Sequence, residues 1–264
     1  MKTVVIEGGD GAGKTTLARA LATEISKYAG YEGYYLRFPS DGIDGFRNFF
    51  LAQNAERPTL DSAANEVSWR SGYKQTIPPL TNLLHITADF NYGFNALLGS
   101  PAVAAVYKRK AQPVFVIDRE LLSTIVYQIL YPYALDKADL PQVVHQRNIM
   151  CAILRTVAEA NPVHKHSLLI FLDTAAHGCV PQRADVFDGL NQDRLGKHFM
   201  DLYMALGGEE GRASLDCLNS KAPFFATRHI DWLRERFPDR MALSAFSDTS
   251  ANMAAAIAKK VCDV

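Results

Sequence analysis

The sequence has no excess of charge of either sign. Its 28 Lys and Arg residues balance its 28 Asp and Glu residues, so the formal net charge at pH 7 is zero. This balance argues against steering to nucleic acid by overall charge, although it does not exclude a local basic stripe. Cysteine is also scarce, and none of the spacings is typical of a zinc site: Cys151, Cys179, Cys217 and Cys262. A reducing, intracellular setting is expected.

Long hydrophobic runs are missing as well. No run is long enough to span a bilayer, and Met1 is followed almost directly by a short apolar run rather than by the hydrophobic region of a signal peptide. We therefore expect a cytoplasmic protein, of a cell or of an infected host cell, with no membrane partner.

The sequence does contain a regular alternation of strand-like and helix-like segments. Short apolar runs predict strands at residues 3–7, 34–38, 113–118, 167–173 and 240–244. Helical spacing of apolar residues predicts helices at 14–30, 191–206 and 249–261, the first with Gly30 as its C-cap. This order predicts an α/β fold, in which helices cover both faces of a parallel sheet.

Two segments, about 41–80 and 129–165, are longer than this plan needs and are expected to carry helices of their own. No linker divides the chain, which predicts a single domain over residues 1–264. The histidines show no metal-ligand spacing, and the "HKH" at 164–166 is expected on the surface.

The stretch "EGGDGAGKTT" at positions 7–16 matches the phosphate-binding pattern G-x-x-x-x-G-K-[ST] and stands between a predicted strand and a predicted helix. Small residues let successive backbone N–H groups surround phosphate oxygens, and the positive end of the helix dipole faces the same anion. Lys14 can reach the outer phosphates and the Thr15 hydroxyl can bind Mg²⁺. The predicted ATP-binding residues are Gly8, Gly9, Asp10, Gly11, Ala12, Gly13, Lys14, Thr15 and Thr16.

Asp118 and Arg119 stand at the end of the predicted strand 113–118. There Asp118 can bind Mg²⁺ directly or through water, and Arg119 can hold a phosphate. The chain has no Asn-Lys-x-Asp motif of a GTPase, and the strand lacks the closing acidic pair of a motor ATPase. These features favour a kinase among the proteins with such a loop.

Several segments together resemble the thymidylate kinase family: "IEGGDGAGKTTLARALA" (6–22), "RFPS" (37–40), "DRELLSTIVYQ" (118–128), "LLIFLDTAAHGCVPQR" (168–183) and the helix-like 185–206. The resemblance implies a P-loop NTPase fold with a five-stranded parallel sheet, helical insertions, an acceptor-binding helical region at about 41–100 and a lid at about 176–197. It also implies ATP and Mg²⁺ as cofactors, a nucleotide substrate and a homodimer formed through helices.

The resemblance also implies roles for single residues. Lys14, Arg119 and Arg183 would neutralise charge on the transferring group, as phosphoryl transfer requires. Gly11 stands where some members carry an arginine, which gives weight to the basic lid residues Arg183, Arg194 and Lys197. The implied metal ligands are Thr15 and Asp118, and the implied acceptor-binding residues are Asp10, Arg37, Ile86, Phe90, Arg119, Ser123, Tyr127 and Gln128.

The match breaks in the region that binds the base. Ile86 and Phe90 stand where the family has a stacking aromatic residue and an arginine that reaches the base, and Glu120 replaces the tyrosine of an Asp-Arg-Tyr signature. A phenylalanine offers none of the hydrogen-bond donors of an arginine. Two acceptors stay open: dTMP or a 5-modified dUMP, and, as in some viral relatives, 5-hydroxymethyluracil within DNA that becomes hypermodified thymidine.

DNA as a substrate would suit "SWRSGYK" (68–74) and "YKRK" (107–110), because single-strand binding surfaces mix aromatic and basic residues. A third alternative is a nucleotide sensor that binds ATP without transferring phosphate. The coincidence of Arg37, Asp118-Arg119 and Arg183 disfavours it, since a sensor does not need several phosphate-binding arginines.

Overall fold

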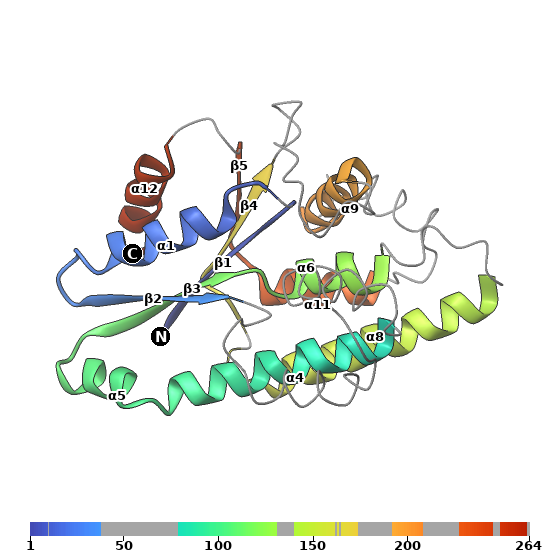
Figure 1. Ribbon diagram of the computed structural model, residues 1–264, viewed down its shortest axis with the longest axis horizontal. Coiled ribbons are helices and arrows are strands. Elements are labelled where there is room, and N and C mark those ends of the chain that lie inside the picture. The colour runs from blue at the N-terminus through green and yellow to red at the C-terminus, as the bar shows by residue number, and fades with distance from the viewer. Residues whose placement is uncertain are drawn as a thin grey trace, which may run out of the picture.

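The computed structural model describes residues 1–9, 11–37, 79–130, 140–161, 163, 165–173, 192–207, 227–244 and 249–262. Within these ranges, five parallel strands form one sheet in the order β2-β3-β1-β4-β5 (Figure 1). The strands are β1 (Lys2–Gly8), β2 (Tyr31–Arg37), β3 (Gln112–Asp118), β4 (Leu168–Asp173) and β5 (Arg240–Ser244). The predicted five-stranded parallel sheet is confirmed.

Alternate residues of the central strands face two different cores. Val4 and Ile6 of β1 pack towards α1 (Lys14–Ile25) and α12 (Ser250–Cys262). Val5 lies in a larger core on the other face, which a second group of helices covers (Figure 1). The elements on that face are α4 (Pro79–Leu98), α5 (Pro101–Lys108), α6 (Leu121–Ile125), the π-helix η1 (Val126–Leu130), α8 (Leu140–Ala160), α9 (Gln192–Ala205) and α11 (Thr227–Arg236). Two covered faces explain the near-continuous apolar sequences of β1, β3 and β4.

The predicted helices at 191–206 and 249–261 are confirmed, since α9 and α12 differ from them by one residue at each end. The expected helix within 129–165 is α8, whereas the segment from residue 41 to 78 lies outside the described residues. None of the helices that the structure describes has both the length and the hydrophobicity that crossing a membrane requires.

The first helix is shorter than predicted. It ends at Ile25, where the N–H of Ser26 donates to the Ala22 carbonyl, so the prediction that it runs to Gly30 is wrong. Gly30 (φ 84°) instead belongs to the turn into β2, and its carbonyl accepts the N–H of Gln112. The chain must leave the helix early because β2 already starts at Tyr31.

β2 starts three residues before the predicted strand at 34–38. Gly33, which weakens a strand pattern in sequence, is needed where β2 passes α1. A Cβ atom at this position would lie 2.1 Å from the Ala22 carbonyl oxygen, so no larger residue fits without moving the backbone. The side chain of Ser26 completes this contact by accepting the Gly33 N–H at 2.9 Å.

Candidate active site

The loop between β1 and α1 has the backbone conformation that the glycine pattern predicts. Gly8, Gly11 and Gly13 all have positive φ angles, of 143°, 78° and 83°. Gly8 also lies against β4, because a Cβ atom there would be 2.5 Å from the Leu172 carbonyl oxygen. Among the described residues, no atom would lie within 4 Å of a Cβ built at Gly13, so there is open space beside this glycine in the described part of the chain. The loop can therefore accommodate an anion beside its backbone.

The start of α1 supplies hydrogen-bond donors to the same place. Gly13 is its N-cap and provides no side-chain acceptor, and the first turn contains no acidic residue. The positive end of the helix dipole therefore favours an anion such as a phosphate at this place. Lys14 is buried, and its Nζ donates to the carbonyl of Gly9, which keeps the ammonium within the loop. Ala12 is buried, while Thr16 is exposed.

Asp118, at the end of β3, joins the loop to the neighbouring strands. Its Oδ2 accepts hydrogen bonds from Thr15 Oγ1 at 2.6 Å and from the Tyr35 hydroxyl at 3.2 Å. Burial raises the pKa of Tyr35, and the negative charge of Asp118 raises it further. Asp118 is fully buried, and its Oδ1 has no hydrogen-bond partner among the described residues.

This arrangement fits a magnesium ion. Mg²⁺ prefers oxygen ligands and is held by one or two protein oxygens together with substrate phosphates and water. Thr15 Oγ1 and the carboxylate of Asp118 are such oxygens, and Thr15 lies in the first turn of α1, directly after the phosphate loop. These two residues would hold the ion, which when bound would neutralise charge on the phosphates.

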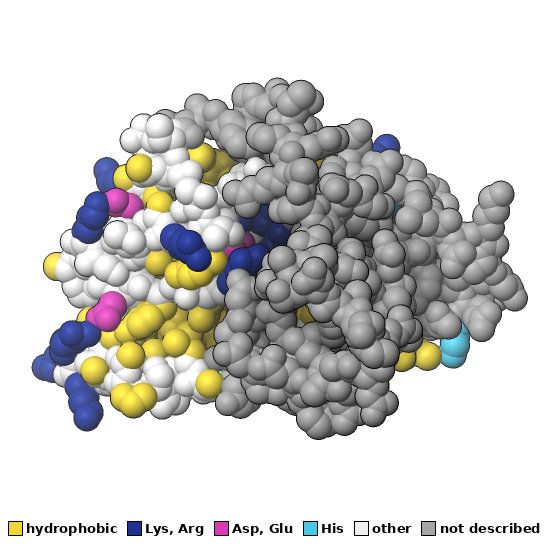
Figure 2. All heavy atoms as spheres, viewed as in Figure 1, with side chains coloured by type: hydrophobic (Ala, Val, Ile, Leu, Met, Phe, Trp, Pro, Cys, Tyr) yellow, Lys and Arg dark blue, Asp and Glu magenta, His cyan; other side chains and the backbone are white. Residues whose placement is uncertain are grey.

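Two arginines stand beside Asp118. Arg37, the last residue of β2, is the Cα partner of Asp118 across the sheet. Arg119 follows Asp118, and its guanidinium lies over the ring of Tyr127, 5.5 Å from the centroid. Figure 2 shows Lys and Arg side chains gathered near the carboxyl ends of the strands, with an acidic side chain between them. A positive surface of this kind would attract phosphate groups.

Arg119 has an unusual backbone, with φ at 70°. This left-handed conformation costs on the order of 1 kcal/mol for a residue other than glycine, so contacts on both sides must hold it. The Arg119 N–H donates to the Ile6 carbonyl at 3.0 Å, and the next N–H, of Glu120, donates to Glu7 Oε1 at 2.7 Å.

Glu7 is a buried residue of the site for which no role was predicted. The carboxylate of Glu7 accepts two hydrogen bonds from Ser123, one from its backbone N–H at 3.1 Å and one from its hydroxyl group. Burial raises the pKa of Glu7, and the hydrogen bonds from Ser123 and Glu120 oppose this rise. Ser123, expected at the acceptor, is buried and bonded to Glu7; its contact with an acceptor stays a prediction. A glutamate inside an apolar strand was the only signal for Glu7 in the sequence.

Glu120, which replaces the tyrosine of the family signature, forms a buried ion pair with Arg236. Both Nε (3.1 Å) and Nη2 of Arg236 donate to its Oε1, and His166 Nε2 lies 2.9 Å from the same oxygen. Burial alone would raise the pKa of Glu120, but the Arg236 charge, aided by His166, lowers it to about 2. The carboxylate is therefore charged at neutral pH.

The expectation that the "HKH" histidines lie on the surface is wrong for His166, which is 1% exposed. Its Nδ1 lies 3.1 Å from Thr3 Oγ1, and its ring stacks on Phe237 with centroids 5.2 Å apart. Burial lowers the pKa of His166, so the neutral ring is favoured. The sequence could not reveal this, because the ring lies against Phe237, Thr3 and Glu120, which are all distant in the chain.

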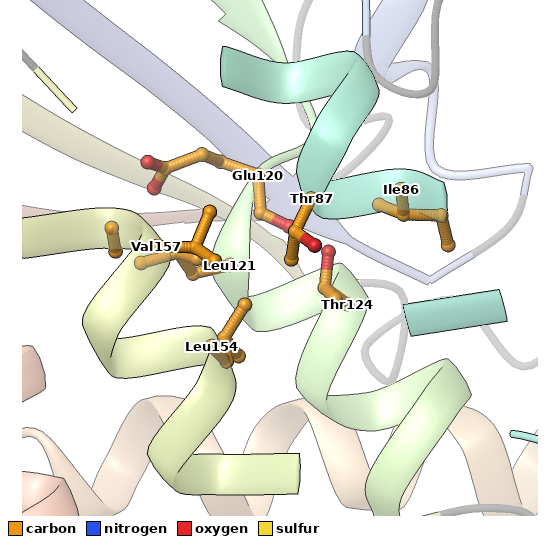
Figure 3. A pocket seen from close by; sticks show the side chains of 8 residues that line it. Ile86, Thr87, Glu120, Leu121, Thr124, Leu154 and Val157 are labelled. Atoms are coloured by element: carbon orange, nitrogen blue, oxygen red, sulfur yellow. The ribbon is translucent and has the colours of Figure 1, made fainter. Parts of the chain in front are cut away.

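The residues expected to bind the base are only partly described. Ile86, half-buried on α4, lines a small pocket with Thr87, Glu120 and Thr124, as Figure 3 shows; α8 closes it with Leu154 and Val157. Phe90 and Gln128 belong to α4 and η1, but their side chains, like that of Arg194 in α9, lie outside the described part. Asp10 and Arg183 are outside it altogether, and Lys197 is exposed on α9.

The basic "YKRK" segment lies away from this site. Lys108 ends α5, and Arg109 and Lys110 precede β3, so they stand at the start of a strand whose opposite end carries Asp118. Arg109 pairs with Glu32 near the start of β2. Because all five strands are parallel, these charges lie at the amino ends of the strands and the phosphate loop lies at their carboxyl ends (Figure 1).

No family model and no curated protein matches the sequence. A solved thymidylate kinase from Candida albicans is 14% identical and superposes with a TM-score of 0.51, over 98% of this chain and 90% of that one. The chain has the thymidylate kinase fold. The thymidylate kinase of Ehrlichia chaffeensis is 15% identical, with a TM-score of 0.46 over 100% of this chain and 98% of that one.

The thymidylate kinase fold confirms the predicted P-loop NTPase architecture. At 14% identity the likeness concerns the fold alone, and the chemistry of this chain depends on its own side chains. Those that the structure brings together are Lys14, Thr15, Tyr35, Arg37, Asp118 and Arg119.

Proposed function

We propose that the chain is an ATP-dependent kinase that transfers the γ-phosphoryl group of ATP to the phosphate of a thymidine-type deoxynucleotide, dTMP or a 5-modified dUMP. The observation that carries the proposal is the junction of the loop with β3. Thr15 is hydrogen-bonded to Asp118 at 2.6 Å, and Asp118 lies between two arginines, one following it and one across the sheet. Such a site can hold a triphosphate with Mg²⁺ and a second phosphate beside it.

Each residue has a defined task in the proposed reaction. Lys14 and the N–H groups of the loop bind the outer phosphates, while Thr15 and Asp118 hold Mg²⁺. Arg37 binds the acceptor phosphate. Arg119 offsets negative charge as the bond from the γ-phosphorus to its bridging oxygen breaks and the bond to the acceptor oxygen forms. The products are ADP and a nucleoside diphosphate. For Arg183, in the segment where a lid is predicted, the proposed task is the same as that of Arg119.

Labelled ATP tests this proposal. The enzyme is incubated with γ-labelled ATP, Mg²⁺ and one of three acceptors: dTMP, 5-hydroxymethyl-dUMP, or DNA that contains 5-hydroxymethyluracil. Label in a nucleoside diphosphate supports the proposal. Label retained only in the polymer would replace it with the DNA kinase alternative. Label transferred to none of them would refute it and favour a nucleotide sensor.

A pair of lysine variants ties the activity to the loop. Lys14→Ala should abolish transfer to every acceptor, because the buried ammonium of the loop is lost. Lys27→Ala is the matched control, since Lys27 follows α1 on the surface and pairs with Glu24. It should transfer label as the wild type does. Unchanged transfer by Lys14→Ala would remove the loop from the mechanism.

A further inference from the structure

The buried ion pair of Glu120 and Arg236 adjoins Arg119, the arginine next to the predicted magnesium ligand. Glu120 is 3% exposed and Arg236 is 2% exposed. A buried ion pair is weak evidence for stability, because removing two charges from water costs about as much as their attraction returns. A role other than stabilisation is therefore needed to explain why this ion pair is buried next to Arg119.

We propose that Glu120 is a positioning residue. The attachment of its own side chain to α11 holds the preceding residue, Arg119, in its left-handed backbone conformation. The proposal rests on the proposed kinase function only in that Arg119 acts on the transferred phosphate. The effect of Glu120 on the backbone of Arg119 can be tested whether or not the chain is a kinase.

The turn at Arg119 is held from both sides. Before it, Asp118 is fixed by Thr15 and Tyr35, and the Arg119 N–H is bound by the Ile6 carbonyl. After it, the Glu120 N–H is bound by Glu7, which directly precedes the phosphate loop. Glu120 thus stands where one residue can control the relation between Arg119 and the loop.

The side chain of Glu120 supplies the second constraint on this residue. Its Oε1 receives Nε and Nη2 of Arg236 and faces Nε2 of His166. Arg236 is itself fixed, because its Nη1 donates to the Val163 carbonyl at 2.9 Å. Arg236 of α11 and His166 before β4 therefore hold Oε1 through three directional contacts, while Oε2 has no hydrogen-bond partner among the described residues. Directional contacts of this number define one orientation, whereas an apolar contact would allow several.

The first test is Glu120→Gln, which keeps the size of the side chain and removes its charge. If Glu120 positions Arg119, kcat for phosphoryl transfer should fall about tenfold to 100-fold, while KM for ATP should stay within about twofold. Glu159→Gln is the matched control, because Glu159 forms an exposed pair with Arg155 on α8. The control should leave kcat unchanged, and an unchanged kcat in Glu120→Gln would overturn the proposal.

A double-mutant cycle identifies the route of the effect. If Glu120 acts through Arg119, adding Glu120→Gln to Arg119→Ala should lower kcat by no more than about twofold further. Losses that multiply in the double variant would show that Glu120 acts independently and would overturn the proposal.

Two measurements separate positioning from folding and from the kinase proposal. The double variant Glu120→Gln/Arg236→Met has no unpaired buried charge. If Glu120 positions Arg119, the melting temperature of this double variant should recover relative to Glu120→Gln while its kcat stays low. Recovery of both would refute positioning.

A crystal structure of Glu120→Gln should show Arg119 with a negative φ or its guanidinium away from Tyr127. An unchanged Arg119 would overturn the positioning role even in an active kinase. A displaced Arg119 would support it even if the wild type phosphorylated none of the tested acceptors.

Discussion

Replacing Arg236 by methionine should destabilise the protein by about 3 kcal/mol at pH 7. The substitution removes the guanidinium but keeps an apolar side chain of similar length, so Glu120 remains buried without its main countercharge. The ion pair and His166 lower the pKa of Glu120 from 4.5 to about 2. At roughly 1.4 kcal/mol per pKa unit, this difference corresponds to about 3 kcal/mol. Losing one partner of a buried pair costs a similar amount, about 3 to 5 kcal/mol.

The assay is urea unfolding followed by circular dichroism, which gives the free energy of unfolding of each variant. Arg155→Met serves as control, because it breaks an Arg–Glu pair whose side chains are 44% and 52% exposed. The control should lose at most about 1 kcal/mol, as exposed pairs usually do. A loss below about 1 kcal/mol in Arg236→Met would refute the reasoning.

The stability of the Arg236→Met variant should also depend on pH in a defined way. A carboxylate whose pKa is lowered by folding stabilises the native state above its unfolded pKa, and this stabilisation is lost as the pH falls towards the folded pKa. For Glu120 the window extends from about pH 4.5 down to about pH 2. The free-energy difference between wild type and Arg236→Met should therefore be larger at pH 7 than at pH 3. It should begin to shrink above pH 4.5, because burial without Arg236 raises the pKa of Glu120 in the variant. An equal difference at pH 7 and pH 3 would mean that the charge of Glu120 is not the cause.

Three further predictions follow from single positions. If Asp118 is the proposed Mg²⁺ ligand, Asp118→Asn should raise the Mg²⁺ concentration needed for half-maximal activity of the proposed kinase by about tenfold or more, measured by titration, because the charge of that ligand is lost. Gly33→Ala should destabilise the fold by about 1 to 3 kcal/mol in urea, and more than Gly30→Ala, because only its Cβ would collide with the Ala22 carbonyl. The lowered pKa of His166 predicts that stability falls as the pH drops below 6.5, and His166→Gln should remove this part of the pH profile.

The backbone of the site was predictable because its signals are local. The glycines of the loop and Lys14 lie within seven residues of one another, and their spacing directly encodes a strand, a turn and a helix N-terminus. The strands β1, β3 and β4 were predictable because burial on both faces leaves an apolar run. β2 was predicted too short, because Gly33 weakens the pattern and its need arises only from contact with α1.

The contacts between distant side chains could not be predicted in the same way. Glu7 and Glu120 are carboxylates in sequence, and their usual place is the surface. Each is buried here because donors from other parts of the fold surround it: Ser123 for Glu7, and Arg236 and His166 for Glu120. Burial of this kind depends on partners that no periodicity encodes.

By itself, the sequence determined the parallel α/β architecture and the loop that can hold a triphosphate, since both follow from residue types at short, regular spacing. Only the tertiary structure decided that Thr15 meets Asp118 across 103 residues and that Glu120 meets Arg236 across 116 residues. The physical reason is that a buried charge is stable only where the folded chain supplies its partner, and the choice of that partner is made when the sheet and its helices pack together.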